Sequence, residues 1–199
     1  MQKDNVFHES SSLNLSRFGI GNWLSDKNIE EKYWDSAIGK CLDYGINWFD
    51  TADSYNNGLA ETQLSTSLRK YSRGSYFIST KLFFPVQKET LFDSSLSKKK
   101  IVDSVNASLY RTKLEYLDLV YLHRFCPKTD PLEILKGIDL LIKQGKILYW
   151  GVSRWPIEAL DHIMKLCDDL GIQKPTFYQD VFNLFQNEST VNNINKLKM

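Results

Sequence analysis

The segment WFDTADSY, residues 48–55, begins as an apolar run and ends in two carboxylates and a phenol. Such a run is typical of a buried strand, and in α/β folds reactive side chains gather where strands end. Asp50 and Tyr55 therefore lie where an active site is expected. Asp53 is better explained as a turn residue, and Glu61 as a carboxylate in the first turn of a helix.

The ends of four further strand-like runs carry reactive groups of other kinds. They are Lys81, His123 with the adjacent Arg124, Ser153 with the adjacent Arg154, and Gln179. Because parallel strands end at one edge of a sheet, these side chains are expected to meet Asp50 and Tyr55 there.

This set of groups suits the protonation of a carbonyl. A free tyrosine has a pKa near ~10, which makes it a poor acid at neutral pH. A lysine ammonium about 4 Å away stabilises a phenolate by up to ~4 kcal/mol at an effective dielectric of ~20. Asp50 would keep Lys81 charged and fixed, while His123 would orient the substrate carbonyl. No side chain supplies a hydride, so the reaction requires a nicotinamide.

Strand-like runs and amphipathic helices alternate along the chain. The runs lie at 17–22, 46–50, 75–83, 117–123, 146–153 and 175–182, and helices are predicted at 30–44, 97–113, 130–144 and 156–171. Most runs are almost continuously apolar, as expected for parallel strands covered on both faces. The alternation predicts an α/β fold, either an open doubly wound sheet or a (β/α)8 barrel. A G-x-G-x-x-G motif does not follow the first strand, which disfavours a Rossmann domain.

Composition and charge favour a single globular domain. The net charge is +1, and 42% of the residues are hydrophobic. The basic stretch at 98–100 is expected to be a solvated helix start, so nucleic acid is not an expected partner. No apolar stretch reaches the ~20 residues of a membrane helix, and residues 1–15 form a polar segment without a signal-peptide core. Cys41, Cys126 and Cys167 fit neither a disulfide framework nor a metal site, so a cytoplasmic location is predicted.

Four motifs, in order, resemble those of the aldo-keto reductases. They are GINWFDTADSYNNGLAE at 45–61, ISTKLF at 78–83, LDLVYLHR at 117–124 and GVSRW at 151–155. Within that family the sequence is most similar to the subgroup of voltage-gated potassium channel β subunits and their bacterial relatives. The resemblance implies a single TIM-barrel domain over 1–199 that binds NADP(H).

The resemblance also implies roles for individual residues. By position, Asp50, Tyr55, Lys81 and His123 match the catalytic tetrad, with Tyr55 as the acid. Matches to cofactor contacts are Asn22, Trp23, Asp50, Ser153, Arg154 and Gln179, with Ser153 and Gln179 at the nicotinamide carboxamide. Asparagine usually replaces the histidine in the channel β subunits, so His123 favours the reductase branch.

The family barrel has eight strands, whereas six are predicted here. After Asn183 the 16 residues that remain are too few for two more units, and NEST at 187–190 is expected to be a tail. The expected fold is therefore an incomplete (β/α)8 barrel, truncated at the C-terminus, that lacks the family's phosphate-binding regions.

The predicted function is NADPH-dependent reduction of an aldehyde or ketone, with the isolated chain weak or inactive. A regulatory protein like the potassium channel β subunits, or a non-functional gene fragment, are the alternatives. Two kinds of partner are left open: a second copy of the chain and a channel.

Overall fold

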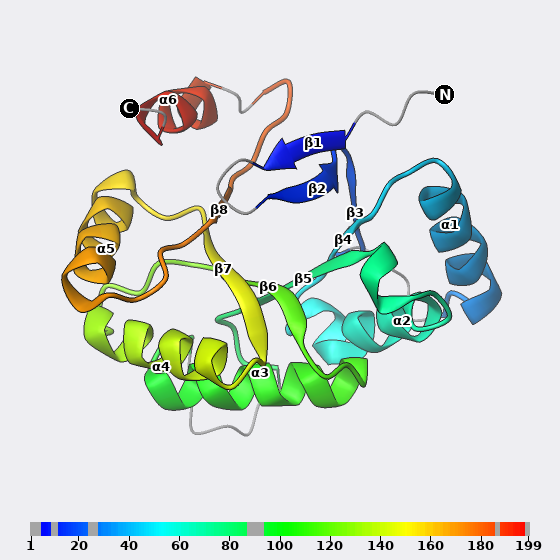
Figure 1. The fold of residues 1–199 in the computed structure, drawn as a ribbon, viewed down its shortest axis with the longest axis horizontal. Helices are drawn as coiled ribbons and strands as arrows, with labels where there is room; N and C mark the ends of the chain where they lie inside the picture. Colours follow the sequence, from blue (N-terminus) through cyan, green and yellow to red (C-terminus); the bar gives the residue numbers. More distant parts are fainter. Residues whose placement is uncertain (1–4, 9–11, 24–27, 87–93, 186–187, 198–199) are drawn as a thin grey trace.

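Six parallel strands form one sheet in the order in which they occur along the chain. The computed structural model describes residues 5–8, 12–23, 28–86, 94–185 and 188–197. The strands are β3 (Gly19–Gly21), β4 (Trp48–Asp50), β5 (Phe77–Leu82), β6 (Leu117–Leu122), β7 (Ile147–Ser153) and β8 (Phe177–Gln179). The sheet curls into a half-barrel with helices along its outer side (Figure 1). This is the expected incomplete TIM barrel, and each predicted strand contains an observed one.

Helices connect the strands and begin and end at recognisable signals. They are α1 (Glu31–Asp43), α2 (Leu59–Leu68), α3 (Lys98–Thr112), α4 (Pro131–Lys143), α5 (Ile157–Leu170) and α6 (Glu188–Leu197), with short 3₁₀ turns η1 (Tyr55–Gly58) and η2 (Arg73–Ser75). The side chain of Asp130 caps α4, in which Pro131 is the first residue, because proline lacks the amide hydrogen that would be unpaired there. Within the described ranges, no helix is long and apolar enough to cross a membrane.

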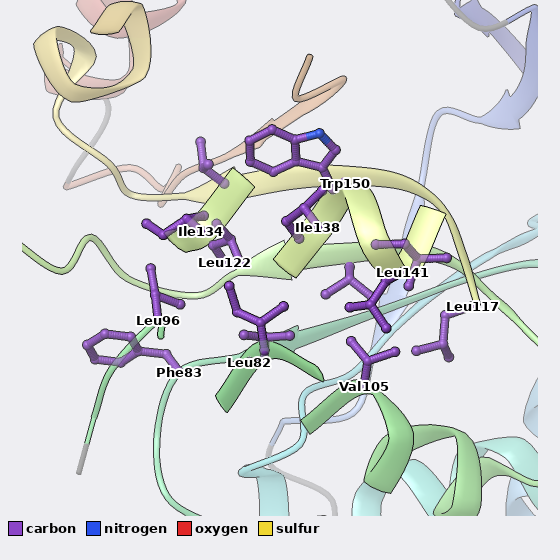
Figure 2. Close-up of a cluster of buried hydrophobic side chains, with 14 of the residues drawn as sticks. Leu82, Phe83, Leu96, Val105, Leu117, Leu122, Ile134, Ile138, Leu141 and Trp150 are labelled. Carbon is purple, nitrogen blue, oxygen red and sulfur yellow. The ribbon is translucent and has the colours of Figure 1, made fainter. Parts of the chain in front are cut away.

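The sheet's two faces have different surroundings because side chains alternate along each strand. Leu82, Leu122 and Trp150 face the helices, and they pack there with Val105 of α3 and Ile138 of α4 (Figure 2). This layer is the main core. All six residues of β5 and of β6 are buried, as expected for parallel strands covered on both faces, although β5 includes Ser79, Thr80 and Lys81.

The inner face of the half-barrel holds a smaller, aromatic core. It contains Leu15, Phe77, Leu119, Tyr121 and Phe177, with Leu13, Trp48 and Tyr149 partly buried against it. Leu13 and Leu15 belong to an antiparallel hairpin of β1 (Asn5–His8) and β2 (Leu13–Ser16), where no strands were predicted from the sequence. Gly151 lies two residues beyond Tyr149 and so faces the same interior. A Cβ at Gly151 would clash with the Phe177 carbonyl oxygen. Glycine thus allows β8 to approach β7.

Three expectations about the helices need correction. Residues 188–190 begin α6 and are not a tail; residue 187 of that stretch lies outside the described residues. In the basic stretch at 98–100, Lys98 and Lys99 are exposed, but Lys100 is buried. Helix α2 was not among the predicted helices, although Glu61 does lie in its first turn as expected.

Candidate functional site

A cleft of about 630 Å³ lies at the C-terminal ends of the parallel strands. Its lining includes seven of the predicted site residues: Trp23, Tyr55, Lys81, His123, Ser153, Arg154 and Gln179. Side-chain alternation explains their convergence, because Lys81 lies two and four residues beyond the inward-facing Ser79 and Phe77. His123 has the same relation to Tyr121 and Leu119, and Gln179 to Phe177. The residues that end these strands therefore continue the inner face into the cleft.

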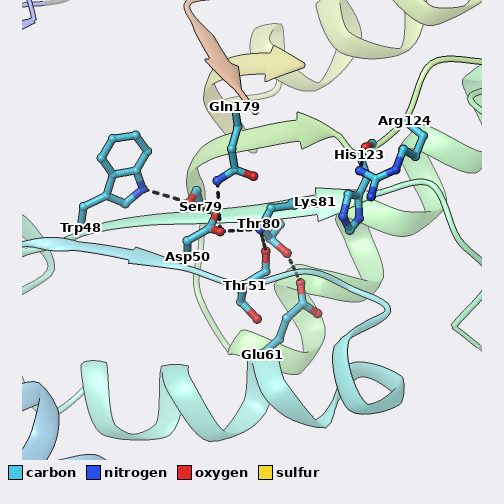
Figure 3. A network of polar contacts seen from close by, with 10 residues as sticks. All are labelled: Trp48, Asp50, Thr51, Glu61, Ser79, Thr80, Lys81, His123, Arg124 and Gln179. Atoms are coloured by element: carbon cyan, nitrogen blue, oxygen red, sulfur yellow. Dashed lines mark hydrogen bonds and ion pairs between the residues drawn. The ribbon is translucent and has the colours of Figure 1, made fainter. Parts of the chain in front are cut away.

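A buried ion pair forms the floor of the site. The Lys81 ammonium lies 2.5 Å from Oδ2 of Asp50 and donates a second hydrogen bond, of 2.8 Å, to the Thr51 carbonyl oxygen. Ser79 donates to the other carboxylate oxygen at 2.6 Å, and Gln179 donates to Oδ2 at 3.3 Å (Figure 3). The Lys81 side chain is 3% exposed, compared with 20% for Asp50. Several donors therefore fix the carboxylate, which in turn fixes the ammonium.

Tyr55 lies over this pair. The Lys81 ammonium is 5.0 Å from the centre of the Tyr55 ring, within the range of a cation–π contact. The ring also meets His123 edge-on at 5.9 Å between centroids and Trp23 at 6.3 Å. The phenol, the ammonium and the imidazole thus share one wall of the cleft.

The turn that carries Tyr55 has an unusual backbone. Asn56, Asn57 and Gly58 have φ values of 48°, 53° and 87°, and this left-handed region favours asparagine and glycine. A Cβ at Gly58 would lie 2.7 Å from Cδ of Arg111, so glycine is required there for both reasons. The sequence YNNG is therefore suited to a sharp turn that directs Tyr55 into the cleft.

His123 is held neutral. Burial, the nearby Lys81 ammonium and the Arg124 guanidinium lower its pKa to about 3. The Phe84 ring packs against it edge-on at 5.2 Å. Its Nδ1 is buried and has no hydrogen-bond partner in the part of the chain that the structure describes. A neutral imidazole in this position can donate a hydrogen bond to a carbonyl oxygen but cannot act as a strong acid.

Two predicted site residues lie outside the cleft lining. Asn22 is buried, and its side-chain amide donates to the Ala60 carbonyl oxygen at 2.8 Å, which joins the end of β3 to α2. Asp50 lies behind Lys81.

The predicted residues Ser153 and Gln179 end neighbouring strands at the same register position. The Arg154 amide donates to the Gln179 carbonyl oxygen at 2.9 Å, so this pair of strands stays joined at the cleft.

The sequence analysis missed several residues of the lining. Phe84 and Asp180 both contribute to it, as does Arg124, which was noted but given no role. The Arg124 guanidinium donates to the carbonyl oxygen of His123 at 2.6 Å and lies 5.8 Å from the centre of the Phe84 ring. Phe84 follows β5 by two residues, so its position just beyond a strand end was an available signal.

The described residues contain no group of three or more histidine, cysteine or acidic side chains that could hold a metal ion. The cleft lining includes the phenol of Tyr55, the ammonium of Lys81 and the neutral imidazole of His123. A phenol beside a fixed cation is suited to giving up a proton.

Comparisons with known proteins show the family of the chain. A model of the aldo/keto reductase family matches residues 17–197. A Schizosaccharomyces pombe protein, named as a candidate voltage-gated potassium channel subunit beta, is 32% identical over 87% of this chain and 52% of its own length. Similarly named proteins of Oryza sativa subsp. japonica and Arabidopsis thaliana are each 32% identical over 88% of this chain and 54% of their own length. The chain thus spans about half the length of the curated relatives it matches. Because the family model covers most of the residues, the chain belongs to the aldo/keto reductase family.

Proposed function

We propose that this chain carries the proton-donating machinery of an NADP(H)-dependent oxidoreductase that reduces an aldehyde or ketone to an alcohol. One observation carries the proposal: the Lys81 ammonium lies between the Asp50 carboxylate, at 2.5 Å, and the Tyr55 ring, at 5.0 Å from its centre. A cation held in this way stabilises the phenolate that remains after Tyr55 gives its proton to the carbonyl oxygen.

The other residues of the site have supporting roles in this proposal. His123, being neutral, would donate a hydrogen bond to the substrate carbonyl and orient it. Asp50 keeps Lys81 charged, and it is fixed in turn by Ser79 and Gln179. The aromatic rings of Trp23 and Phe84 would exclude water from the reacting carbonyl.

The donor set in the cleft fits the nicotinamide end of the cofactor. Ser153 has a hydroxyl and Gln179 an amide, and the two lie side by side at paired strand ends. Such groups complement a carboxamide, which both donates and accepts hydrogen bonds. Arg154 and Trp23 also line the cleft and would contact the bound cofactor. A bound NADPH would supply the hydride.

The test of this function uses a longer chain, in which the remaining strands of the family barrel are joined after residue 199. Replacing Tyr55 with phenylalanine should lower carbonyl reduction by at least ~10², the scale of general-acid catalysis. Tyr110→Phe is the matched control, since Tyr110 is 86% exposed on α3 and should leave the rate unchanged. Near-normal NADPH oxidation by the Tyr55 variant would exclude this mechanism.

The 199-residue chain itself should bind NADPH weakly and show no measurable turnover. By the family resemblance, we expect the phosphate contacts of the cofactor to come from segments beyond the sixth strand. If three charge-assisted hydrogen bonds of ~1.5 kcal/mol each are absent, affinity falls by roughly 10³. Strands β3 and β8 also form the two ends of the sheet, and such edges invite self-association. A micromolar dissociation constant by isothermal titration would contradict this expectation.

A second candidate function is that of a channel-associated subunit, which the names of the similar proteins support. The test that separates the two functions is whether the longer chain reduces carbonyls in the absence of a channel partner.

The free thiols of Cys41, Cys126 and Cys167 support a reducing compartment such as the cytoplasm for either function.

A further inference from the structure

A group of buried charged side chains lies directly behind the turn that carries Tyr55. Its central member is Asp53, which is fully buried although it is only two residues before Tyr55. Neither carboxylate oxygen of Asp53 has a hydrogen-bond partner of good geometry among the described residues. A buried ionised carboxylate without hydrogen-bond partners is strongly unfavourable. The expected role of Asp53 as a turn residue therefore does not explain why its carboxyl is buried.

A second carboxylate of this group is paired with a cation. Glu61 of α2 is fully buried, and it accepts hydrogen bonds from the Arg111 guanidinium and from the Thr80 hydroxyl, each at 2.6 Å (Figure 3 shows the second). The charge of Glu61 disfavours ionisation of Asp53. Asp53 therefore faces a negative charge while it is itself fully buried.

Two cations of α3 act in the opposite direction. Lys100, whose ammonium donates to the Phe84 carbonyl oxygen at 3.2 Å, and Arg111 both favour the ionised form of Asp53, as does the amide of Ser54 at its side. Burial and the charge of Glu61 outweigh them and raise the pKa of Asp53 to about 7. Asp53 thus differs from an ordinary surface aspartate, which is ionised at neutral pH.

This group is connected to both ends of the Tyr55 turn. At the start of the turn, the Asp53 amide donates to the Lys81 carbonyl oxygen at 3.0 Å. At its end, Gly58 lies against Arg111, the partner of Glu61. A change of charge at Asp53 would therefore act on the position of both Tyr55 and the strand that carries Lys81.

We propose that Asp53 is a positioning residue whose carboxyl is protonated when the Tyr55 turn is closed, and that loss of this proton opens the turn. In the closed turn the neutral carboxyl tolerates burial beside Glu61. Once ionised, it is repelled by Glu61 and gains by moving into water. The consequence for catalysis rests on the proposed role of Tyr55, whereas the opening itself does not.

Hydrogen exchange of the 199-residue chain tests the opening directly. After correction for the intrinsic exchange rate at each pH, protection of amides 53–59 should fall by on the order of 10² between pH 5 and pH 8. This follows if Asp53 titrates near 7 when the turn is closed and near 3.9 when it is open. Amides of β6 should keep their protection over the same range, which separates local opening from global unfolding.

Substitutions at Asp53 and at a control aspartate identify the group whose titration changes the protection. Asp53→Asn mimics the protonated carboxyl, so amides 53–59 should stay protected at pH 8 as they are at pH 5. Asp161→Asn, which removes an exposed carboxylate of α5, is the matched control and should retain the wild-type profile. Equal pH dependence in wild type and Asp53→Asn would overturn the proposal.

A direct measurement on the unaltered chain covers the case in which Asp53→Asn does not fold. The carboxyl carbon of Asp53, observed by ¹³C NMR, should titrate near pH 7. A midpoint below pH 5 would show that Asp53 is ionised in the closed turn and would disprove the proposal. Neither readout depends on NADPH or on turnover, so failure of the proposed enzymatic function leaves this test valid.

Discussion

Two ion pairs at opposite ends of the sheet have the same closest distance but different surroundings. Lys81 and Asp50 meet at the C-terminal end, and Arg73 and Asp118 meet at the N-terminal end, each with a nitrogen–oxygen distance of 2.5 Å. At the first pair the cation is the more buried partner: the Lys81 side chain is 3% exposed and that of Asp50 is 20% exposed. At the second pair the carboxylate is the more buried partner: the Asp118 side chain is 10% exposed and that of Arg73 is 24% exposed.

The Arg73–Asp118 pair makes several hydrogen bonds within the fold. Asp118 also accepts from the Ile78 amide at 2.8 Å, and Arg73 donates to the carbonyl oxygen of Tyr76 at 3.1 Å. The guanidinium lies 4.1 Å from the centre of the Tyr116 ring. Burial nevertheless raises the pKa of Asp118, against the effects of Ile78 and Arg73. This pair joins η2 to β5 and β6.

An ion pair alone therefore does not mark a site. The Arg73 guanidinium also lies over tyrosine rings, beside a hollow of about 370 Å³. What distinguishes Lys81 is that its cleft also holds the neutral imidazole of His123, the hydroxyl of Ser153 and the amide of Gln179. The two pairs should therefore respond differently when one partner is removed.

The largest expected effect on stability is at the Arg73–Asp118 pair. Arg73→Leu leaves the Asp118 carboxylate buried without its cation and should lower the free energy of unfolding by about 3–5 kcal/mol. Urea denaturation followed by circular dichroism measures it. Lys113→Met, at an exposed lysine that lines the same hollow as Arg73, should change stability by less than ~0.5 kcal/mol. A loss below ~1 kcal/mol for Arg73→Leu would show that the pair is not a structural link.

At the Lys81–Asp50 pair the same kind of change should cost less stability but more function. Lys81→Met leaves the Asp50 side chain, which is 20% exposed, still bonded to Ser79 and Gln179, so we expect about 1–2 kcal/mol of destabilisation. In the longer chain, carbonyl reduction should fall at least as far as in Tyr55→Phe. If Lys81→Met lowers the free energy of unfolding as much as Arg73→Leu does, or leaves carbonyl reduction unchanged, the two pairs do not differ in role.

The smallest expected effect is a change in how steeply the free energy of unfolding depends on pH. The pKa of His123 is lowered to about 3 from an ordinary 6.5, so the unfolded chain binds a proton there that the folded chain does not. Its contribution to stability is complete above pH 6.5 and is lost as the pH falls towards 3, by at most ~1.4 kcal/mol per pH unit.

His123→Asn, which places the channel-subunit residue in the site, should flatten the stability profile between pH 6.5 and pH 4. Denaturation at several pH values measures this slope. His162→Asn, an exposed histidine of α5, should leave the slope unchanged, and an unaltered slope in His123→Asn would contradict the burial argument. Asp53 has the opposite sign, since its raised pKa makes stability fall as pH rises from 3.8 to about 7.

Local sequence determined the six strands of the main sheet, most of the helices and seven residues of the cleft lining. The apolar runs, the cap at Asp130 and the glycine that ends α5 depend on neighbours only a few residues away. Because the ends of parallel strands meet at one edge, the positions of Asp50, Lys81 and His123 in their runs were enough to bring them together. The motifs then indicated the family, which the comparisons confirm.

Tertiary structure alone decided which charges are buried. Asp53 and Lys100 have polar neighbours in sequence and were expected in a turn and in a solvated helix start, yet the packing of α2 and α3 against the sheet buries both. Glu61 and Arg111 are 50 residues apart, and Arg73 and Asp118 are 45 apart. Because burial and charge pairing depend on contacts made only after the chain folds, no local pattern in the sequence specifies them.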